Sequence, residues 1–169
     1  QLVPRDRRFE IPERILANGT VHRALDEQSL DKIVEALRDQ KIESIGIVFL
    51  HSYRNGTHER IAGERISKLL PEISVSLSCD VAPEIREYER ASTTIANAYV
   101  KPLARDYLEE LSERLYAHDI TSPLMLMLSN GGLTHVGEVR RSPVQMLESG
   151  PAAGALAAAD IGRAENLDQ

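Results

Sequence analysis

The order in which helical and strand patterns alternate is the feature that most limits how this chain folds. Apolar residues recur at helical spacing from Ser29 to Gln40, and the short apolar run IGIVFL follows within residues 44–50. A second helical pattern from Glu59 to Leu70 is followed by an alternating run at 73–77. A continuous apolar run such as IGIVFL is typical of a strand that is covered on both faces. The sequence therefore predicts an α/β fold with a mixed or mostly parallel sheet and flanking helices.

Two local signals refine the first half of the chain. The pair Asn18-Gly19 separates two weakly alternating segments within residues 1–24, and such a pair favours the tight turn of a β-hairpin. Thr57 has a side-chain oxygen of the kind that caps helices, so we expect it to cap the helix that begins at Glu59. We also expect His58 to order the preceding loop through a hydrogen bond near this helix start.

A long helical pattern runs from Ala91 to His118, with Ser92 or Thr93 as the expected cap. Pro102 lies inside it and removes one backbone donor, so it either kinks the helix or divides it in two. Because the apolar stripe continues across Pro102 in phase, the sequence predicts a single kinked helix.

The last third of the chain predicts a strand at 123–128, a short helix at 136–141, a strand at 144–147 and a final helix at 151–163. Neither a linker nor a repeat interrupts these patterns. We therefore predict one domain over residues 1–169.

Composition excludes several classes of function. The net charge of −6, with no Trp and two Phe, argues against nucleic-acid binding, which needs cations for phosphates and aromatic rings for bases. The single cysteine, Cys79, suits a reducing cytoplasm, and no apolar run approaches the ~20 residues that cross a bilayer. His51 and His58 lack the spacing of a metal-binding motif, so we expect no metal site.

Polar groups follow three of the predicted strands, where ligands bind in sheets of this kind. The substrate-site candidates among them are His51, Tyr53, Glu84, Arg86, Asn130 and Gly131. Polar loops follow strands in most proteins, so a purely structural role fits the same positions. The charged run from Glu84 to Arg90 equally predicts a solvated or salt-bridged surface, in which Arg86 or Arg90 could instead hold a substrate carboxylate.

Three small motifs have mainly structural interpretations. Gly131 and Gly132 are expected to adopt backbone angles that are closed to larger residues. Cys79 has no His or Lys beside it in sequence, so we interpret it as a small buried hydrophobic residue rather than a nucleophile. The Gly-x-Ser-x-Gly elbow is absent around Ser149, and the catalytic residues therefore stay unassigned.

The segment MLESGPAAGALA at 146–157 predicts a thin helix. Gly150 permits a tight turn and Pro151 suits the first helical turn, where its missing N–H costs nothing. The small residues that follow leave room for close approach. The free N–H groups at this end could attract an anion, or the helix could pack against a moving domain.

Three long stretches together resemble one family. They are LHSYRNGTHE, EIREYERASTTIANAYVKP and LSNGGLTHVGEVRRSPVQMLESGPAAGALAAADIGR. In this order they closely resemble the hydantoinase A and 5-oxoprolinase family, which includes N-methylhydantoinases and the nucleotide-binding subunits of acetone and acetophenone carboxylases. The resemblance implies part of an ATP-dependent cyclic-amide hydrolase, of hydantoin or 5-oxoproline type, with an actin-like ATPase fold related to ribonuclease H.

The resemblance also implies ATP and Mg²⁺ for the parent protein and a hydantoinase B-type partner subunit or domain. It places Glu148, Gly150, Pro151, Ala152 and Gly154 beside the nucleotide. Both glycine-rich phosphate loops of the family are missing, so we interpret the chain as an internal fragment that is inactive and binds no cofactor by itself. Two alternatives remain open: part of a ketone carboxylase ATP-binding subunit, or a non-catalytic subunit-interaction domain.

Overall fold

The computed structural model describes residues 2–165. They divide into two compact units, with the boundary between Pro102 and Leu103. The first unit contains, in chain order, a 3₁₀ turn at Arg5–Arg7, β1 (Arg14–Ile15), β2 (Val21–Arg23), α1 (Glu27–Asp39), β3 (Ser44–Ile47), α2 (Thr57–Leu69), β4 (Ser74–Leu77) and α3 (Ser78–Val81). Helix α4 (Glu87–Ala117) begins in the first unit and ends in the second. The single domain predicted from the sequence stays a prediction, because two compact units can belong to one domain.

The second unit continues with β5 (Met125–Met127), β6 (Leu133–His135), α5 (Val136–Arg141), a 3₁₀ turn η2 (Pro143–Met146) and α6 (Ser149–Ala164). The described strands form three separate two-stranded sheets, of which β3–β4 is parallel and the other two are antiparallel. The α/β class is confirmed, but a single larger sheet is wrong. Within residues 2–165, no helix is long and apolar enough to cross a membrane.

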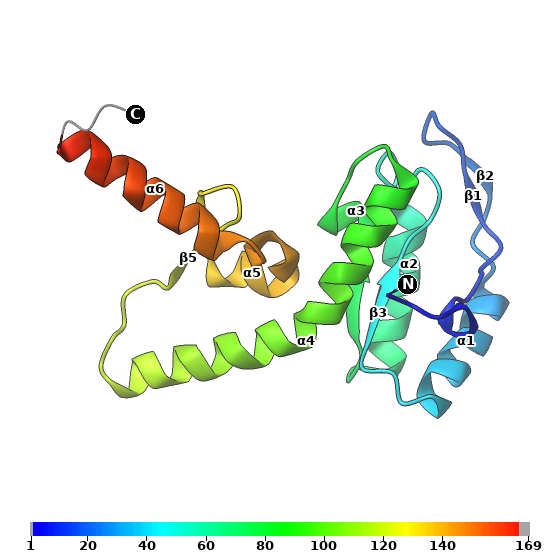
Figure 1. Cartoon of the computed structure of the whole chain (residues 1–169). Coiled ribbons are helices and arrows are strands. Elements are labelled where there is room, and N and C mark those ends of the chain that lie inside the picture. Colours follow the sequence, from blue (N-terminus) through cyan, green and yellow to red (C-terminus); the bar gives the residue numbers. More distant parts are fainter. Residues whose placement is uncertain (1, 166–169) are drawn as a thin grey trace. The chain divides into compact units, whose positions relative to one another are not determined.

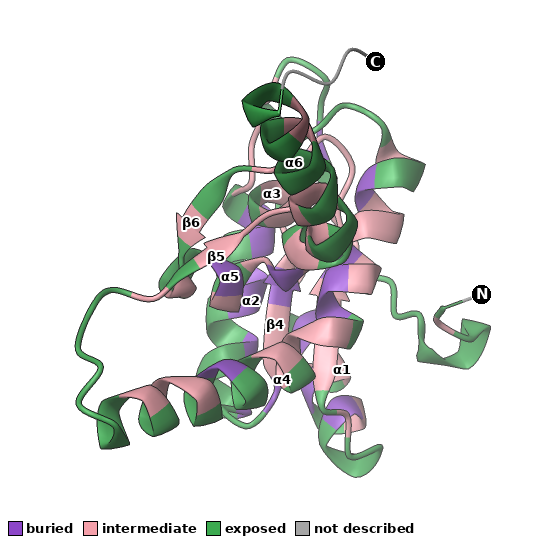
Figure 2. Ribbon diagram, turned by 60° about the vertical axis from the view of Figure 1, so that its left-hand side comes forward, coloured by how far each residue is buried: buried purple, intermediate pink, exposed green. Residues whose placement is uncertain are grey.

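The parallel pair β3–β4 has one apolar face, which forms the core of the first unit. Ile45 lies opposite Val75 and Ile47 opposite Leu77, so every second position turns toward α1 and α2. The buried members of this core are Leu30, Val34, Leu37, Ile47, Ala62, Ile66, Leu70 and Ile73. Figure 2 shows buried residues in purple on α1 and α2.

The other face of the pair carries small residues and packs against the first turns of α4 (Figure 1). Gly46 lies opposite Ser76 in the register, and a Cβ at Gly46 would stand 2.8 Å from Cδ1 of Ile95. Ser76 Oγ accepts a hydrogen bond of 3.0 Å from Nδ2 of Asn97. The sheet is covered on both faces, as its apolar run predicts, but one cover is a close, partly polar contact.

The predicted hairpin at the N-terminus is confirmed. β1 and β2 pair antiparallel, and the turn between them contains Gly19 at φ 88°. Asn18 Oδ1 accepts hydrogen bonds from the backbone N–H and the hydroxyl of Thr20, at 3.0 and 2.8 Å. The Asn-Gly pair forms the turn because glycine adopts a left-handed conformation at little cost.

The start of α2 differs from the prediction. Thr57 is the first residue of α2 and Gly56 occupies the cap position, so Thr57 as the N-cap is wrong. Asn55 Oδ1 accepts from both the N–H and the hydroxyl of Thr57, at 3.1 and 2.6 Å. This side chain, two residues before the helix, therefore takes over the capping that the hydroxyl was expected to provide.

Helix α4 is one continuous element that passes through Pro102, which confirms the prediction of a single helix. The expected caps Ser92 and Thr93 are wrong, because α4 begins earlier, at Glu87. A different stripe on α4 is buried: Arg90, Thr94 and Asn97 are each at most 1% exposed and recur at helical spacing. This polar stripe faces the sheet. The apolar positions of the same helix, on which the prediction was based, do not reveal it.

In the second unit, β5 and β6 form a hairpin around the SNGG turn, and α5 spans the predicted 136–141. The final helix is confirmed with a start at Ser149, so Pro151 lies in its first turn. The predicted strand at 144–147 is wrong: Pro143 opens the 3₁₀ turn η2 instead. The backbone N–H groups of Gln145 and Leu147 bond to carbonyls three residues earlier, at Ser142 and Val144, as in a 3₁₀ turn.

A close contact at the start of α2 generates a first prediction. A Cβ at Gly56 would stand 2.8 Å from the Cβ of Cys79, which is attached to backbone and cannot rotate away. We expect Gly56→Ala to lower the free energy of unfolding by about 1–3 kcal/mol in urea denaturation. Gly46→Ala is the matched control, because its nearest contact is the terminal methyl of Ile95; a loss as large as that of Gly56→Ala would contradict the prediction.

Candidate functional site

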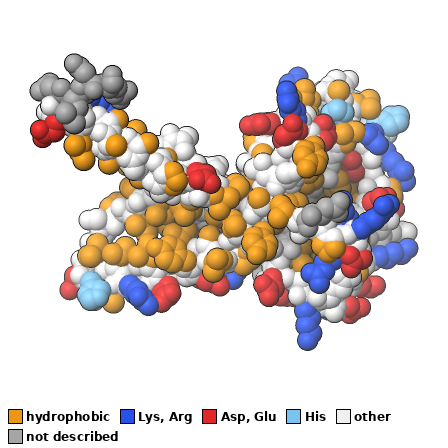
Figure 3. All heavy atoms as spheres, in the orientation of Figure 1, with side chains coloured by type: hydrophobic (Ala, Val, Ile, Leu, Met, Phe, Trp, Pro, Cys, Tyr) orange, Lys and Arg blue, Asp and Glu red, His pale blue; other side chains and the backbone are white. Residues whose placement is uncertain are grey.

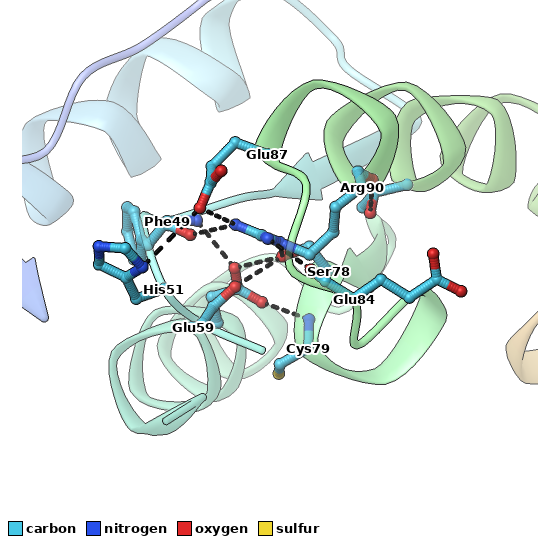
Figure 4. Close-up of polar contacts among 10 residues, drawn as sticks. Phe49, His51, Glu59, Ser78, Cys79, Glu84, Glu87 and Arg90 are labelled. Carbon is cyan, nitrogen blue, oxygen red and sulfur yellow. Dashed lines mark hydrogen bonds and ion pairs between the residues drawn. The ribbon is translucent and has the colours of Figure 1, made fainter. Parts of the chain in front are cut away.

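A cluster of polar side chains lies where β3 and β4 end (Figure 4). Glu59, in the first turn of α2, is fully buried. Its Oε1 accepts from the N–H of Phe49 at 2.8 Å and from the hydroxyl of Ser78 at 2.6 Å, and its Oε2 accepts from the N–H of Cys79 at 2.8 Å. One carboxylate therefore joins the ends of both strands to α2.

Arg90 approaches the same cluster from α4, and its side chain is fully buried. Its Nε donates to Ser78 Oγ at 3.1 Å, Nη1 to the carbonyl of Glu84 at 2.8 Å, and Nη2 to the carbonyl of Phe49 at 2.9 Å. Its guanidinium carbon also lies 5.6 Å from the centre of the Tyr53 ring. Ser78 accepts from Arg90 and donates to Glu59, so the hydroxyl links the two buried charges. We call Glu59, Ser78 and Arg90 the buried relay.

The buried relay corrects one interpretation of the charged run. Arg90 is neither on a solvated face nor free to hold a substrate carboxylate, because its donors are committed to protein oxygens. Arg86 is different: its side chain is 76% exposed and pairs with Glu89 at 3.5 Å. The run from Glu84 to Arg90 thus combines an exposed surface with one buried anchor.

His51 follows β3 in a strained loop. Its φ is 57°, a left-handed conformation that few non-glycine residues adopt. Its Nδ1 is buried without a hydrogen-bond partner and lies 3.9 Å from Oε1 of Glu87. The His51 ring meets the Tyr53 ring edge-on, with centroids 6.1 Å apart.

Of the predicted site residues, the structure brings His51 and Tyr53 together beside the buried relay. Glu84 contributes its backbone carbonyl to Arg90, while its side chain is exposed, as is that of Arg86. These four residues belong to the first unit, whereas Asn130 and Gly131 belong to the second.

Sequence reasoning missed Glu59 and Ser78. Glu59 appeared only as the start of a helix, and Ser78 was not singled out. A usable signal existed, since Glu59 is an acidic residue in the first turn of the helix that comes next after β3. Arg90 had a signal as well, in its spacing of four and seven residues from Thr94 and Asn97.

The neighbouring residues have structural roles. Burial, followed by the charges of Glu59 and Asp80, raises the pKa of the half-buried Cys79 thiol to about 12. The thiol is therefore protonated at neutral pH, which agrees with its interpretation as a non-nucleophile. His58 Nδ1 forms a 2.7 Å contact with Oε2 of Glu13. The expected hydrogen bond near the helix start is present, but its partner lies in the N-terminal segment and not in the loop before α2.

In the second unit, the two glycine-containing motifs lie side by side. Ser129 Oγ donates to the carbonyl of Gln145 at 2.7 Å and accepts from the N–H of Glu148 at 3.0 Å. Asn130 Oδ1 accepts from the N–H of Gly132 at 2.9 Å, which closes the turn. Gly131 has φ 82°, as expected, but Gly132 does not share this conformation, so the expectation for Gly132 is wrong.

The predicted nucleotide-adjacent residues form the start of α6. Glu148 is the cap residue, and its carbonyl accepts from the N–H of Ala152 at 3.2 Å. Gly150 and Gly154 are exposed, with no other residue's atoms within 4 Å of an added Cβ. Pro151 is exposed between them. The structure therefore provides a thin, accessible helix end, which is the local geometry that the small residues predict.

Comparison with known families places the chain. Residues 1–70 match the hydantoinase/oxoprolinase N-terminal region, and residues 90–169 match the hydantoinase/oxoprolinase family. The chain belongs to the hydantoinase/oxoprolinase family, as its three motifs indicate.

Individual relatives agree with this assignment. The chain is 35% identical over 151 residues to caprolactamase subunit alpha of Pseudomonas jessenii, covering 89% of this chain and 22% of the relative. It is 38% identical over 131 residues to 5-oxoprolinase of Saccharomyces cerevisiae, covering 78% of this chain and 10% of the relative. The chain therefore spans less than a quarter of the length of either protein.

Two solved structures share the fold. The crystal structure of ATP-dependent caprolactamase from Pseudomonas jessenii matches with a TM-score of 0.87 and 32% identity, over 99% of this chain and 24% of that chain. A nucleotide-free structure of acetone carboxylase matches with a TM-score of 0.80 and 27% identity, over 92% of this chain and 22% of that chain.

The buried relay generates a second prediction. In Glu59→Gln, the amide oxygen still accepts hydrogen bonds, but the negative charge near Arg90 is lost. The amide NH₂ group would also face donors that now bond to the carboxylate. We expect the free energy of unfolding to fall by about 2–4 kcal/mol in urea denaturation. Glu64→Gln, on an exposed position of the same helix, is the control and should stay within about 0.5 kcal/mol of the parent. Equal stability of the two variants would show that the relay contributes little.

A third prediction concerns the SNGG turn. The backbone of Gly131 has φ 82°, which is unfavourable for valine, and an added Cβ would stand 2.9 Å from Cδ1 of Leu156. Gly131→Val should therefore lower the free energy of unfolding by about 1–3 kcal/mol. Gly137→Ala is the control, because that position has open space and lies in helix α5. A thermal melt of Gly131→Val that coincides with the parent curve would disprove the strain.

Proposed function

We propose that this chain is part of an ATP-dependent hydrolase of cyclic amides, of the hydantoin or 5-oxoproline type. The observation that carries the proposal is the match over 99% of the chain to ATP-dependent caprolactamase, together with 38% identity to a 5-oxoprolinase. Both relatives are named for cyclic-amide substrates. The same match supports an actin-like ATPase fold for the parent protein.

In this proposal, ATP bound with Mg²⁺ would supply the phosphoryl group that activates the ring amide for attack by water. The start of α6 is the wall of the nucleotide site that this chain provides. The space beside Gly150 is open, and the free N–H groups at a helix N-terminus favour a bound anion. Glu148, Pro151, Ala152 and Gly154 shape this wall, and the rest of the parent chain supplies the phosphate loops.

The first unit contributes the loop after β3 to the substrate site. His51 and Tyr53 lie on this loop, and the buried relay holds it through both backbone groups of Phe49. Arg86, exposed at the start of the α4 region, is available to a substrate carboxylate or to a partner subunit. Glu84 shares that surface. Asn130 and Gly131 form a separate candidate, on the turn between β5 and β6 of the second unit.

A hydantoinase B-type partner is part of the proposal, since the relative from Pseudomonas jessenii is itself a subunit alpha. The acetone carboxylase match favours one alternative, in which the parent is the ATP-using subunit of a ketone carboxylase. In that case the activated group would be a ketone rather than a ring amide.

The test compares substrates with the full-length parent and its partner subunit. We expect Mg-ATP hydrolysis to depend on a cyclic amide, with ADP release matched by ring opening of hydantoin, 5-oxoproline or caprolactam. ATP hydrolysis that responds only to acetone or acetophenone with bicarbonate would instead establish the carboxylase. ATP turnover indifferent to all of these compounds would overturn both assignments.

A fourth prediction concerns the 169-residue chain alone. Micromolar affinity requires ~8 kcal/mol, whereas a helix N-terminus contributes only about 0.3–1 kcal/mol at an exposed site. Isothermal titration of the chain with Mg-ATP should therefore show no saturable heat in the micromolar range. A dissociation constant of a few micromolar would mean that these residues already contain a complete nucleotide site.

A further inference from the structure

The unpartnered nitrogen of His51 needs an explanation. Its Nδ1 is buried without a hydrogen bond, in a residue whose backbone is also strained. A buried polar atom without a partner costs free energy, and strained backbone persists where the surroundings or a function require it. Both features fall on one residue at the end of a parallel strand.

Charged and titratable groups approach His51 from each neighbouring element. From α2, Glu59 is occupied by its three donors, and from α4, Arg90 is occupied by its acceptors. Tyr53, on the same loop, contacts the His51 ring edge-on. Glu87 remains: its Oε1 lies 3.9 Å from His51 Nδ1 and 3.9 Å from Arg90 Nη2. It is the carboxylate best placed to accept from the imidazole.

Glu87 is also partly exposed to solvent at a helix end. It is the first residue of α4, and its side chain is 43% exposed. A shift of about 1 Å would bring its carboxylate to hydrogen-bond distance from Nδ1. Catalytic hydrogen bonds are often long in the absence of substrate and shorten when it binds.

We propose that Glu87 is a positioning residue for His51, and that His51 is the proton acceptor of the substrate site. Glu87 accepts the Nδ1–H of the neutral ring, which fixes the tautomer and leaves the Nε2 lone pair free. Figure 4 shows the second ring nitrogen pointing away from Glu87 and the buried relay. This inference rests on the proposed cyclic-amide hydrolase.

The proton transfer follows from that tautomer. As the oxygen of water bonds to the ring carbon activated by ATP, Nε2 takes one proton of that water. The C=N electron pair of the activated amide moves onto the ring nitrogen. Nδ1–H stays directed at Glu87, whose negative charge stabilises the imidazolium that forms.

The direct test is the tautomer of His51 in the 169-residue chain. ¹⁵N-histidine labelling gives signals for the five histidines, and His51→Gln identifies the signal of His51. At a pH where the ring is neutral, we expect the Nδ1–H tautomer in the parent. Glu87→Ala should shift the ring mainly to the Nε2–H form, whereas Glu87→Gln keeps an acceptor and should retain Nδ1–H.

The signal of His58, held by Glu13, serves as an internal control for folding and should stay unchanged in all variants. An Nε2–H tautomer in the parent chain would overturn the inference. So would an Nδ1–H tautomer that survives in Glu87→Ala with the His58 signal intact.

Kinetics of the full-length parent separate this inference from the proposed function. We expect His51→Gln to lower kcat at least 100-fold with KM within about twofold, and Glu87→Ala to lower kcat less, with recovery in Glu87→Gln. Glu64→Ala, exposed on α2, is the unchanged control. A parent without cyclic-amide-dependent ATP turnover would refute the proposed function while the tautomer still reports on Glu87. Normal kcat in His51→Gln would refute the inference alone.

Discussion

The first unit depends on a buried carboxylate and a buried guanidinium that share one hydroxyl. Glu59 accepts a hydrogen bond from the N–H of Phe49, and Arg90 donates one to the carbonyl of Phe49. These two side chains replace the strand partner that Phe49 lacks beyond the end of β3. Two charges removed from water are tolerable only where every donor and acceptor is matched. Ser78 completes the match, and the loop with His51 is held in a strained conformation as a result.

The way α4 packs follows from the same requirement. Its buried stripe is polar, with Asn97 donating to Ser76 and Lys101 donating to the carbonyl of Val75 at 2.7 Å. Burial lowers the pKa of Lys101, as expected for an ammonium withdrawn from water. A polar contact requires exact partners, whereas the apolar contact of α1 and α2 on the opposite face tolerates small shifts. The side chains between α4 and the sheet are therefore held more specifically than those on the apolar face.

In the second unit, one side chain joins the two motifs that carry the family resemblance. Ser129 contacts both the turn before α6 and the cap residue of α6. Close packing of Gly131 against Leu156 reinforces this contact. The turn and the helix start thus form one local structure, which explains why their small residues belong together although the sequence separates them.

Local signals were sufficient for the elements whose causes lie within a few residues. Examples are the Asn18-Gly19 hairpin, α5 and the left-handed Gly131. The buried relay was decided only by tertiary structure, because Arg90 reaches the carbonyl of Phe49 across 41 positions in sequence. In sequence, Arg90 belongs to a charged run that is typical of a solvated surface. The helical spacing of Arg90, Thr94 and Asn97 indicates that they share one face of α4, but it does not show which distant donors and acceptors that face meets.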